Sequence, residues 1–254
     1  MSRNGKKIIA VIPARNAAKT IEWVIDDIPK DWVDGIFLSD NASKDQTAAL
    51  AEARGITVFR HSTDRGYGGN QKTCYREALK AGVDIIVMVH ADHQYDPKLL
   101  PRLVGPLLRG EADAIFGSRM MIKSNARKGG MSWWRFTANV ALTCIENMVL
   151  HMGLSEYHSG YRAYTKEVLR AMPFEKNSDN YVFDTEIIAQ MSMAGFSIKE
   201  VPIPTYYFPE ASSPNFFQSM NYGLSILLVM FKFFLHRTGI KRYAFLIIQK
   251  RAAS

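Results

Sequence analysis

The stretch VMVHADHQYDP, residues Val87 to Pro97, decides the fold that this chain is expected to adopt. An apolar run from Asp84 to Val89 ends in a polar cluster of His90, Asp92, His93, Gln94 and Asp96. Buried strands of a parallel sheet are continuous apolar runs, and ligands bind beyond the carboxyl ends of such strands. Oxygen and nitrogen ligands at that edge suit a hard divalent cation held on a diphosphate. The stretch therefore predicts a strand followed by a metal-binding loop.

A second interpretation treats the same residues as the start of a helix. Asp92 or Asp96 would then cap the helix that Pro97 opens. Capping explains Asp96 well, but it leaves His90, Asp92 and Gln94 without a role. We therefore prefer the metal interpretation for those three residues.

The first 117 residues alternate strands with helices. The expected strands are Lys7–Pro13, Gly35–Asp40, Ile56–Arg60, Asp84–His90 and Asp113–Ser118. The expected helices are Thr20–Ile28, Gln46–Arg54, Asn70–Ala81 and Lys98–Leu108, with Gly66–Gly69 as a flexible loop. This alternation predicts an α/β fold, in which a mostly parallel sheet with right-handed crossovers is flanked by helices.

The second half becomes more helical and ends in an apolar tail. We expect a helix at Trp133–Leu150, a short strand in GYRAY, a helix at Asp184–Ala194 and a strand at Ser197–Ile203. The tail segment Tyr222–Leu235 is apolar on nearly every face. It would form about 21 Å of helix, short of the roughly 30 Å hydrocarbon core of a bilayer. An interfacial helix is expected, and a helix packed on the domain or on a second copy of the chain is the alternative.

Composition and cysteine usage are those of an ordinary globular protein. The chain has 254 residues, 47% hydrophobic and 22% charged, which suits one large domain or one domain with an appendage. Cys74 and Cys144 lie far apart and form no CxxC pair, so a reducing compartment is favoured over a disulfide framework or a zinc site. The basic N-terminus runs into only about seven apolar residues before Pro13, which indicates a strand rather than a signal peptide.

The net charge of +8 is concentrated in two windows that contain no acidic residue. The window after Glu210 contains Lys232, Arg237, Lys241, Arg242, Lys250 and Arg251. The window Ala114–Ile145 contains Arg119, Lys123, Arg127, Lys128 and Arg135. Such patches suit phosphate ligands, nucleic acid or an anionic membrane. Nucleic acid is not expected as a partner, because the chain has no recognition motif for it.

Seven motifs in order resemble one enzyme family: VIPARN, SDNASKDQT, RGYGGNQ, HADHQYDP, GSR, HSGYRAY and FDTEIIAQ followed by EVPIP. Together they resemble the inverting family 2 glycosyltransferases of GT-A fold, and among them the dolichyl- or polyprenyl-phosphate sugar synthases. The resemblance covers roughly residues 7 to 210. It implies a catalytic domain at residues 1–210, a basic apolar helical segment at 211–254 for membrane or oligomer contact, and a peripheral location at the cytoplasmic face of the membrane.

The resemblance also assigns a nucleotide site. PARN matches the motif that closes around the nucleotide base, although Arg15 and Ala17 stand where tyrosine and glutamate are common, so the choice between GDP and UDP donors stays open. Asp40 is similar to the aspartate that meets the base or ribose, with a turn residue as the alternative. Gly68 matches a loop under the nucleotide, and Lys72 faces either the diphosphate or solvent. The nucleotide-sugar residues implied are Pro13, Ala14, Arg15, Asn16, Asp40, Gly68, Lys72, Ala91 and Asp92.

The implied metal site differs from the family pattern. Where many relatives have DxDxQ, this chain has His90-x-Asp92-x-Gln94. Asp92 is the expected principal ligand and Gln94 the second, whereas His90 either binds the metal or hydrogen-bonds the nucleotide. Loss of one carboxylate weakens affinity for a hard cation and shifts preference from Mg²⁺ toward Mn²⁺.

The implied site for the acceptor's phosphate is rich in arginine. Its residues are Arg119, Arg135, Asn139, Ser159 and Arg162, with Glu156 nearby. A guanidinium matches phosphate oxygens in a bidentate manner. A surface ion pair is the alternative for any single arginine.

The resemblance implies in-line displacement of a nucleotide diphosphate by a polyprenyl or dolichyl phosphate. A phosphate monoester, with a second pKa of about 6, needs positioning rather than deprotonation. The runner-up acceptor, a hydroxyl on a glycan, lipid or small molecule, needs a general base, for which Asp184 and Glu186 are candidates. A sugar-1-phosphate nucleotidyltransferase would have a glycine-rich first turn, which PARNAAKT lacks. A non-catalytic protein that binds the membrane surface is the remaining alternative.

Overall fold

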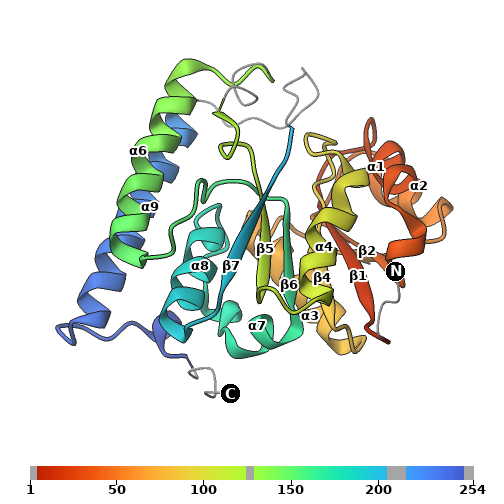
Figure 1. Cartoon of the computed structure of the whole chain (residues 1–254). Coiled ribbons are helices and arrows are strands. Elements are labelled where there is room, and N and C mark those ends of the chain that lie inside the picture. The colour runs from red at the N-terminus through yellow and green to blue at the C-terminus, as the bar shows by residue number, and fades with distance from the viewer. Residues whose placement is uncertain (1–4, 124–128, 205–215, 249–254) are drawn as a thin grey trace.

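The protein folds around one twisted seven-stranded sheet of strand order β3-β2-β1-β4-β6-β5-β7 (Figure 1). The computed structural model describes residues 5–123, 129–204 and 216–248. The strands are β1 (Ile8–Ala14), β2 (Gly35–Asp40), β3 (Thr57–Arg60), β4 (Ile85–Met88), β5 (Ala114–Ser118), β6 (Arg162–Thr165) and β7 (Ile198–Pro202). Neighbouring strands are parallel except around β6, which is antiparallel to both β4 and β5. The predicted α/β architecture is therefore confirmed.

Helices cover both faces of the sheet. They are α1 (Ile21–Asp27), α2 (Thr47–Ala53), α3 (Gly66–Lys80), α4 (Leu100–Leu108), α6 (Trp133–Leu150), α7 (Lys166–Ala171), α8 (Phe183–Ala194) and α9 (Phe216–Arg237). Single 3₁₀ turns lie at η1 (Lys30–Trp32), η2 (Pro97–Leu99), η3 (Phe174–Lys176) and η4 (Ala244–Leu246). One apolar core joins the sheet to α3, α8 and α9, and a second joins it to α1 and α4.

The central strand β4 forms because its apolar run is buried on both faces. It is shorter than predicted, since regular pairing stops at Met88, but Val89 still donates to the carbonyl of Val11 at 2.9 Å. The chain leaves the sheet between β1 and β6 directly after this residue. The strand thus delivers His90 and Asp92 to the carboxyl edge of the sheet, as the sequence predicts.

Helix α3 begins four residues earlier than predicted. The glycines at 66–69 form its first turn instead of a flexible loop. A Cβ on Gly68 would lie 2.4 Å from the carbonyl oxygen of Ser178 and 2.8 Å from Cβ of Phe183. Glycine is needed there so that the helix can approach the segment before α8, and this packing offsets the poor helix propensity of glycine.

The tail helix α9 is longer than predicted. Its 22 residues span about 33 Å, so the expectation that it is too short to cross a bilayer is wrong. Within the described ranges, Phe217–Arg237 is the one helix long and apolar enough to do so, with a mean hydropathy of 1.2. One face is nevertheless buried in the core through Ile226, Val229 and Phe233.

Several predictions fall on residues outside the described ranges. They are the domain boundary between residues 210 and 211 and the basic residues Arg127, Lys128, Lys250 and Arg251. Helix α9 packs in the same core as α3 and α8.

Candidate active site

A pocket of about 680 Å³ lies beyond the carboxyl ends of β1 and β4. Its walls come from the loops after these strands, the start of α3, and helices α6 and α9. The predicted site residues that line it are Pro13, Ala14, Arg15, Asn16, His90, Ala91, Asp92, Gln94, Arg119, Arg135, Asn139 and Asp184. The fold therefore brings together most of a set that is scattered along the sequence. Asp40, Gly68, Lys72, Ser159, Arg162 and Glu186 are not among the lining residues.

Asp92 and Gln94 are held together by a tight turn. Oδ1 of Asp92 accepts a hydrogen bond from the backbone N–H of Gln94 at 3.1 Å. Gln94 is 7% exposed, and both residues line the pocket. The turn therefore presents a carboxylate and a side-chain amide to the same space.

His90 lies at the same edge and is half-buried. Its Nε2 has no hydrogen-bond partner among the described residues. Burial lowers the pKa of His90, and this outweighs the opposing effect of Asp92 and Asp184. A Cβ on Gly160 would lie only 2.0 Å from Nε2. Glycine at 160 thus makes room for a neutral imidazole, the form that binds a metal.

The other polar residues of the opening stretch point elsewhere. Nε2 of His93 lies 3.0 Å from Oδ2 of Asp27. Oδ1 of Asp96 accepts from the N–H of Lys98 at 2.9 Å and caps η2. The capping interpretation therefore holds for Asp96, while Asp92 and Gln94 face the pocket.

The end of the pocket near β1 is built from two loops that brace each other. Asn16, in a left-handed conformation with φ of 51°, accepts from the N–H of Lys44 at 2.8 Å through its side-chain oxygen. Arg15 forms an ion pair of 2.5 Å with Asp64. Asp40 is buried, and its neighbour Asn41 lines the pocket instead. The sequence reasoning missed both residues, because Asn41 follows Asp40 in a motif that drew attention to the aspartate, and Asp64 directly precedes RGYGGNQ.

Lys72 is buried and is not among the residues that line the pocket. Its Nζ donates to the carbonyl of Asn177 and to Oδ1 of Asp179, both at 2.6 Å, and the residue is 8% exposed. Gly68 packs against the same segment. This placement does not support the predicted nucleotide contacts of Lys72 and Gly68, and assigns both residues to the junction of α3 with the segment before α8.

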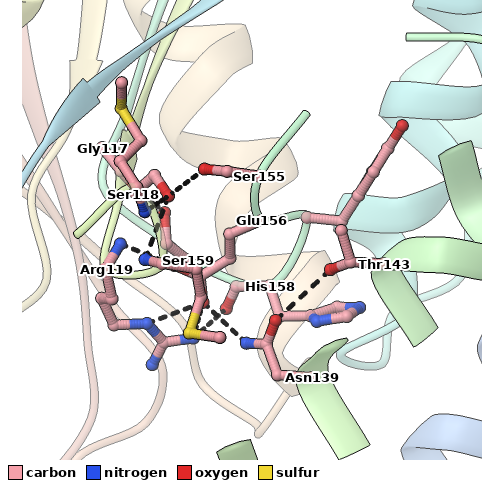
Figure 2. Close-up of polar contacts among 12 residues, drawn as sticks. Gly117, Ser118, Arg119, Asn139, Thr143, Ser155, Glu156, His158 and Ser159 are labelled. Atoms are coloured by element: carbon pink, nitrogen blue, oxygen red, sulfur yellow. Dashed lines mark hydrogen bonds and ion pairs between the residues drawn. The ribbon is translucent and has the colours of Figure 1, made fainter. Parts of the chain in front are cut away.

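Arg119 is held at the pocket wall by a buried carboxylate (Figure 2). Its backbone N–H and its Nε each donate to Glu156 at 2.7 Å, and Nη2 contacts the same carboxylate. Nδ2 of Asn139 also donates to Glu156, at 2.8 Å. Burial alone would raise the pKa of Glu156. The contacts with Arg119 and Asn139 together have a larger opposite effect, so the pKa of Glu156 is below its ordinary value. The guanidinium is therefore fixed in orientation at the pocket.

Two predicted phosphate ligands lie behind the wall. Arg162, 1% exposed, donates from Nε to the carbonyl of Ser159 and from Nη2 to that of Tyr157, both at 2.7 Å. Its guanidinium lies 4.7 Å from the ring centroid of Phe116. The hydroxyl of Ser159 donates to the carbonyl of Gly117. Because these groups are engaged inside the fold, the structure does not support their predicted contact with phosphate.

Asp184 and Glu186, the candidate general bases, occupy different surroundings. Asp184 lines the pocket and accepts from the hydroxyl of Tyr67 at 3.0 Å and from Nε2 of Gln71 at 3.2 Å. It also lies 3.3 Å from Nη1 of Arg162. Glu186 accepts from the N–H of Ser178 at 2.6 Å, away from the pocket, and burial raises its pKa. Both carboxylates are therefore engaged in holding neighbouring segments.

The remaining wall comes from α6 and α9 and was missed by the sequence reasoning. Trp134 and Leu142 of α6 and Tyr222 of α9 line it, together with His158 from the loop between α6 and β6. The sequence analysis assigned the tail helix to membrane or oligomer contact, and nothing in its sequence indicated that it contributes to the pocket.

Comparison with known proteins identifies the family. A family model described as glycosyl transferase family 2 matches residues 9–172, which include β1, β4 and the loops that follow them. The chain belongs to glycosyl transferase family 2.

Relatives of this family 2 glycosyltransferase include enzymes named for lipid-phosphate acceptors. It is 25% identical to the UDP-N-acetylglucosamine–dolichyl-phosphate N-acetylglucosaminyltransferase of Methanococcus voltae, over 80% of this chain and 86% of that one. It is 27% identical to the undecaprenyl-phosphate mannosyltransferase of Micrococcus luteus, over 78% of this chain and 82% of that one.

The family 2 glycosyltransferase also has the GT-A fold of solved structures. One is glucosyl-3-phosphoglycerate synthase from Mycobacterium tuberculosis, in complex with Mn²⁺, UDP and glucosyl-3-phosphoglycerate. The two share a TM-score of 0.70 and 22% identity, over 94% of this chain and 82% of that one. The predicted fold family is confirmed.

Proposed function

We propose that this glycosyltransferase moves a sugar from a GDP- or UDP-sugar to a polyprenyl or dolichyl phosphate, with inversion and with a divalent metal. One observation supports this most strongly: Asp92, Arg119 and side chains of α6 and α9, Arg135 among them, all line a single pocket. The pocket thus has groups for a donor diphosphate, an acceptor phosphate and an apolar chain. The relatives named for dolichyl and undecaprenyl phosphate agree with such an acceptor.

The donor is assigned to the end near β1. Pro13, Arg15 and Asn16 line that end together with Asn41. The Mycobacterium tuberculosis neighbour binds UDP, and the Methanococcus voltae relative is named for a UDP-sugar. A uridine donor is therefore the first to test, with GDP-sugars beside it.

The residues at the end of β4 fit a divalent cation. Asp92 supplies a carboxylate, Gln94 an amide oxygen, and His90 an imidazole whose Nε2 is buried without a partner among the described residues. Across the described ranges no three His, Cys, Asp or Glu side chains gather into a complete site, so diphosphate oxygens would complete the set. A bound Mg²⁺ or Mn²⁺ would offset charge on the leaving diphosphate. The solved neighbours were obtained with either ion.

The chain's own groups position the acceptor. Arg119 is fixed by Glu156 and faces the pocket, where a guanidinium can hold a phosphate in bidentate fashion. An acceptor that is already an anion needs alignment with the anomeric carbon rather than deprotonation. Asp184, held by Tyr67 and Gln71, keeps the pocket wall in place. This arrangement favours a phosphate acceptor over a hydroxyl, because neither acidic candidate is poised as a free base.

The outer surface of α6 and α9 suits a membrane. Helix α6 exposes Trp133 and Met148, 73% and 70% exposed, while it buries Asn139 and Glu146. Helix α9 beside it exposes Phe217, Leu224, Leu228, Phe231 and Phe234. Lys232, Arg237, Lys241 and Arg242 lie on or after α9. Exposed apolar side chains with basic residues are typical of a helix at a lipid interface, so we place the protein peripherally at the cytoplasmic face.

A transfer assay tests the proposal. Radiolabelled UDP- and GDP-sugars are offered with polyprenyl phosphate and either Mg²⁺ or Mn²⁺, and label is counted in the organic phase. We expect metal-dependent label in the lipid fraction, and none when the matching polyprenol replaces its phosphate. Equal transfer to polyprenol would instead identify a hydroxyl acceptor, and no transfer to any acceptor would reject the proposal.

A further inference from the structure

The inner face of α6 is polar where a packed helix is normally apolar. Asn139, Thr143 and Glu146 lie about one turn apart and are buried, at 7%, 7% and 0% exposed. Asn139 donates to Glu156 and accepts from the hydroxyl of Thr143 at 3.3 Å. Glu146 joins neither contact. Glu146 is thus a buried carboxylate with no part in the proposed transfer.

His158 is the group that faces Glu146. Its Nε2 lies 2.9 Å from Oε2 of Glu146. Within the described ranges, neither the oxygens of Glu146 nor Nε2 of His158 makes a hydrogen bond of good geometry. A carboxylate removed from water is stable as an anion only beside a positive charge. The basic group in contact with this carboxylate is the imidazole of His158.

His158 also lies at the acceptor end of the pocket. It is a lining residue, and its carbonyl accepts from Nη2 of Arg119 at 3.3 Å. Its ring lies edge-on to that of Tyr222, with centroids 6.0 Å apart. Figure 2 shows its side chain beside Asn139. Because Nε2 lies beside Glu146, Nδ1 is the ring nitrogen that remains for a ligand.

We propose that Glu146 and His158 form a charge pair that selects acceptors bearing a phosphate monoester, with His158 donating its Nδ1–H to a phosphate oxygen beside Arg119. The inference rests on the proposed function and adds a specificity-determining residue to it. Glu146 acts as a positioning residue, because it sustains the charge and orientation of the ring. The pair would contribute to binding of the phosphate and little to binding of the nucleotide.

Kinetics of Glu146→Gln and His158→Gln test the pair, with farnesyl phosphate as a short acceptor and each substrate varied separately. We expect the acceptor KM to rise about 10- to 100-fold, as for loss of a charged hydrogen bond, with kcat at saturating acceptor and the donor KM within about threefold of wild type. The double variant should be no worse than either single variant, because the two groups act as one unit. His158→Lys, which keeps a cation beside Glu146, should retain most of the acceptor affinity.

Glu175→Gln is the matched control, since Glu175 forms an exposed ion pair with Arg76 away from the pocket. A second readout needs no turnover: the ring nitrogens of His158 are followed by NMR as farnesyl phosphate is added, and both should be protonated in the complex. An unchanged acceptor KM in folded Glu146→Gln, or a neutral ring in the complex, overturns the inference. If the wild type transfers nothing to prenyl phosphate, the proposed function fails, and the NMR titration still decides whether His158 binds a phosphate ester.

Discussion

Asp92 and Asp96, four positions apart, have different roles because their side chains point in different directions. Asp92 follows the last buried residues after β4 and faces the pocket, whereas Asp96 caps η2 through the N–H of Lys98. The residue type is the same, and only the direction of the side chain differs. The pair therefore offers a matched test of the metal assignment.

Asp92→Asn should lower metal-dependent turnover by at least about 100-fold, because one neutral amide replaces the main anionic ligand. Asp96→Asn should keep turnover within about twofold, since asparagine caps helices as well as aspartate does. Initial rates over a range of Mn²⁺ concentrations measure both. Equal losses in the two variants would contradict the metal role of Asp92.

Gly160 is expected to be intolerant of even a methyl group. A Cβ there would overlap Nε2 of His90, so Gly160→Ala should displace the imidazole and cost about 1–3 kcal/mol of stability. Nucleotide binding in the presence of Mn²⁺ should weaken as well. Titration calorimetry and chemical denaturation measure the two effects. Gly35→Ala, whose Cβ would lie 3.8 Å from Phe37, is the control and should bind nucleotide normally.

The position of a site residue could be predicted from the sequence where a strand ends abruptly, but not where the residue lies within a strand of the sheet. Asp92 follows a continuous apolar run, so its place at the sheet edge could be inferred. Arg162 was placed in the pocket by its motif, but it is the first residue of β6, between β4 and β5, and is enclosed there. The sequence did not show that this strand runs antiparallel into the centre of the sheet.

At the scale of elements, the segment between α6 and β6 is held by two glutamates. Glu200 of β7 accepts from the N–H of Ser155 at 2.6 Å and from that of Glu156 at 3.1 Å. Glu156 in turn holds Arg119 (Figure 2). An edge strand thus sets the position of the guanidinium through a chain of contacts.

Glu156→Gln should destabilise the fold by about 3 kcal/mol at neutral pH, as for a broken buried ion pair. The wild-type pKa of Glu156 is below its ordinary value near 4.5, because Arg119 and Asn139 outweigh burial. The stabilisation is thus complete above pH 4.5 and is lost as the pH falls through the lower, folded value. Denaturation from pH 7 to 3 should show the gap between wild type and variant closing only below about pH 4.5. A gap that closes between pH 7 and 5 would contradict this assignment.

The bounds of a helix could be predicted where the apolar periodicity is strong, as in α6. They were harder to predict where contacts with distant segments determine where the helix begins. The first turn of α3 is glycine-rich and is stabilised by the segment before α8. The start of α9 lies in a mixed stretch of polar and apolar residues, FFQSMN, that precedes the apolar run. The local sequence pattern carries no information about the distant segments that these helices contact. Both helices were therefore predicted to begin later than they do.

At the scale of the whole molecule, α6 and α9 lie together at one end, opposite α1 and α2 (Figure 1). Their outer faces are apolar, and basic residues follow along the tail. Removing α9 would uncover the part of the core against which its Ile226 and Phe233 pack. Point substitutions on its outer face are therefore the better test of membrane contact.

Leu224→Gln with Phe231→Gln should weaken flotation with phosphatidylglycerol vesicles about 10-fold or more, because two large apolar side chains leave the interface. The two residues are 59% and 58% exposed, so the fold should be unaffected. High salt should weaken binding of the wild type, since basic side chains contribute. Trp23→Gln, on α1 and 61% exposed, is the control. Flotation that is indifferent both to these substitutions and to salt would exclude membrane contact through this surface.

The antiparallel strand β6 also has a consequence for the order of folding. The half-sheet β3-β2-β1-β4 is built from residues 8–88, and β6, which covers β4, lies at residues 162–165. During synthesis, one edge of the nascent half-sheet must therefore wait unpaired while more than 70 further residues are made. An unpaired edge strand is a template for intermolecular association, and late closure over a long loop slows folding. Ribosome-bound chains that stop before β6 should accordingly depend on chaperones, and those that extend past it should not.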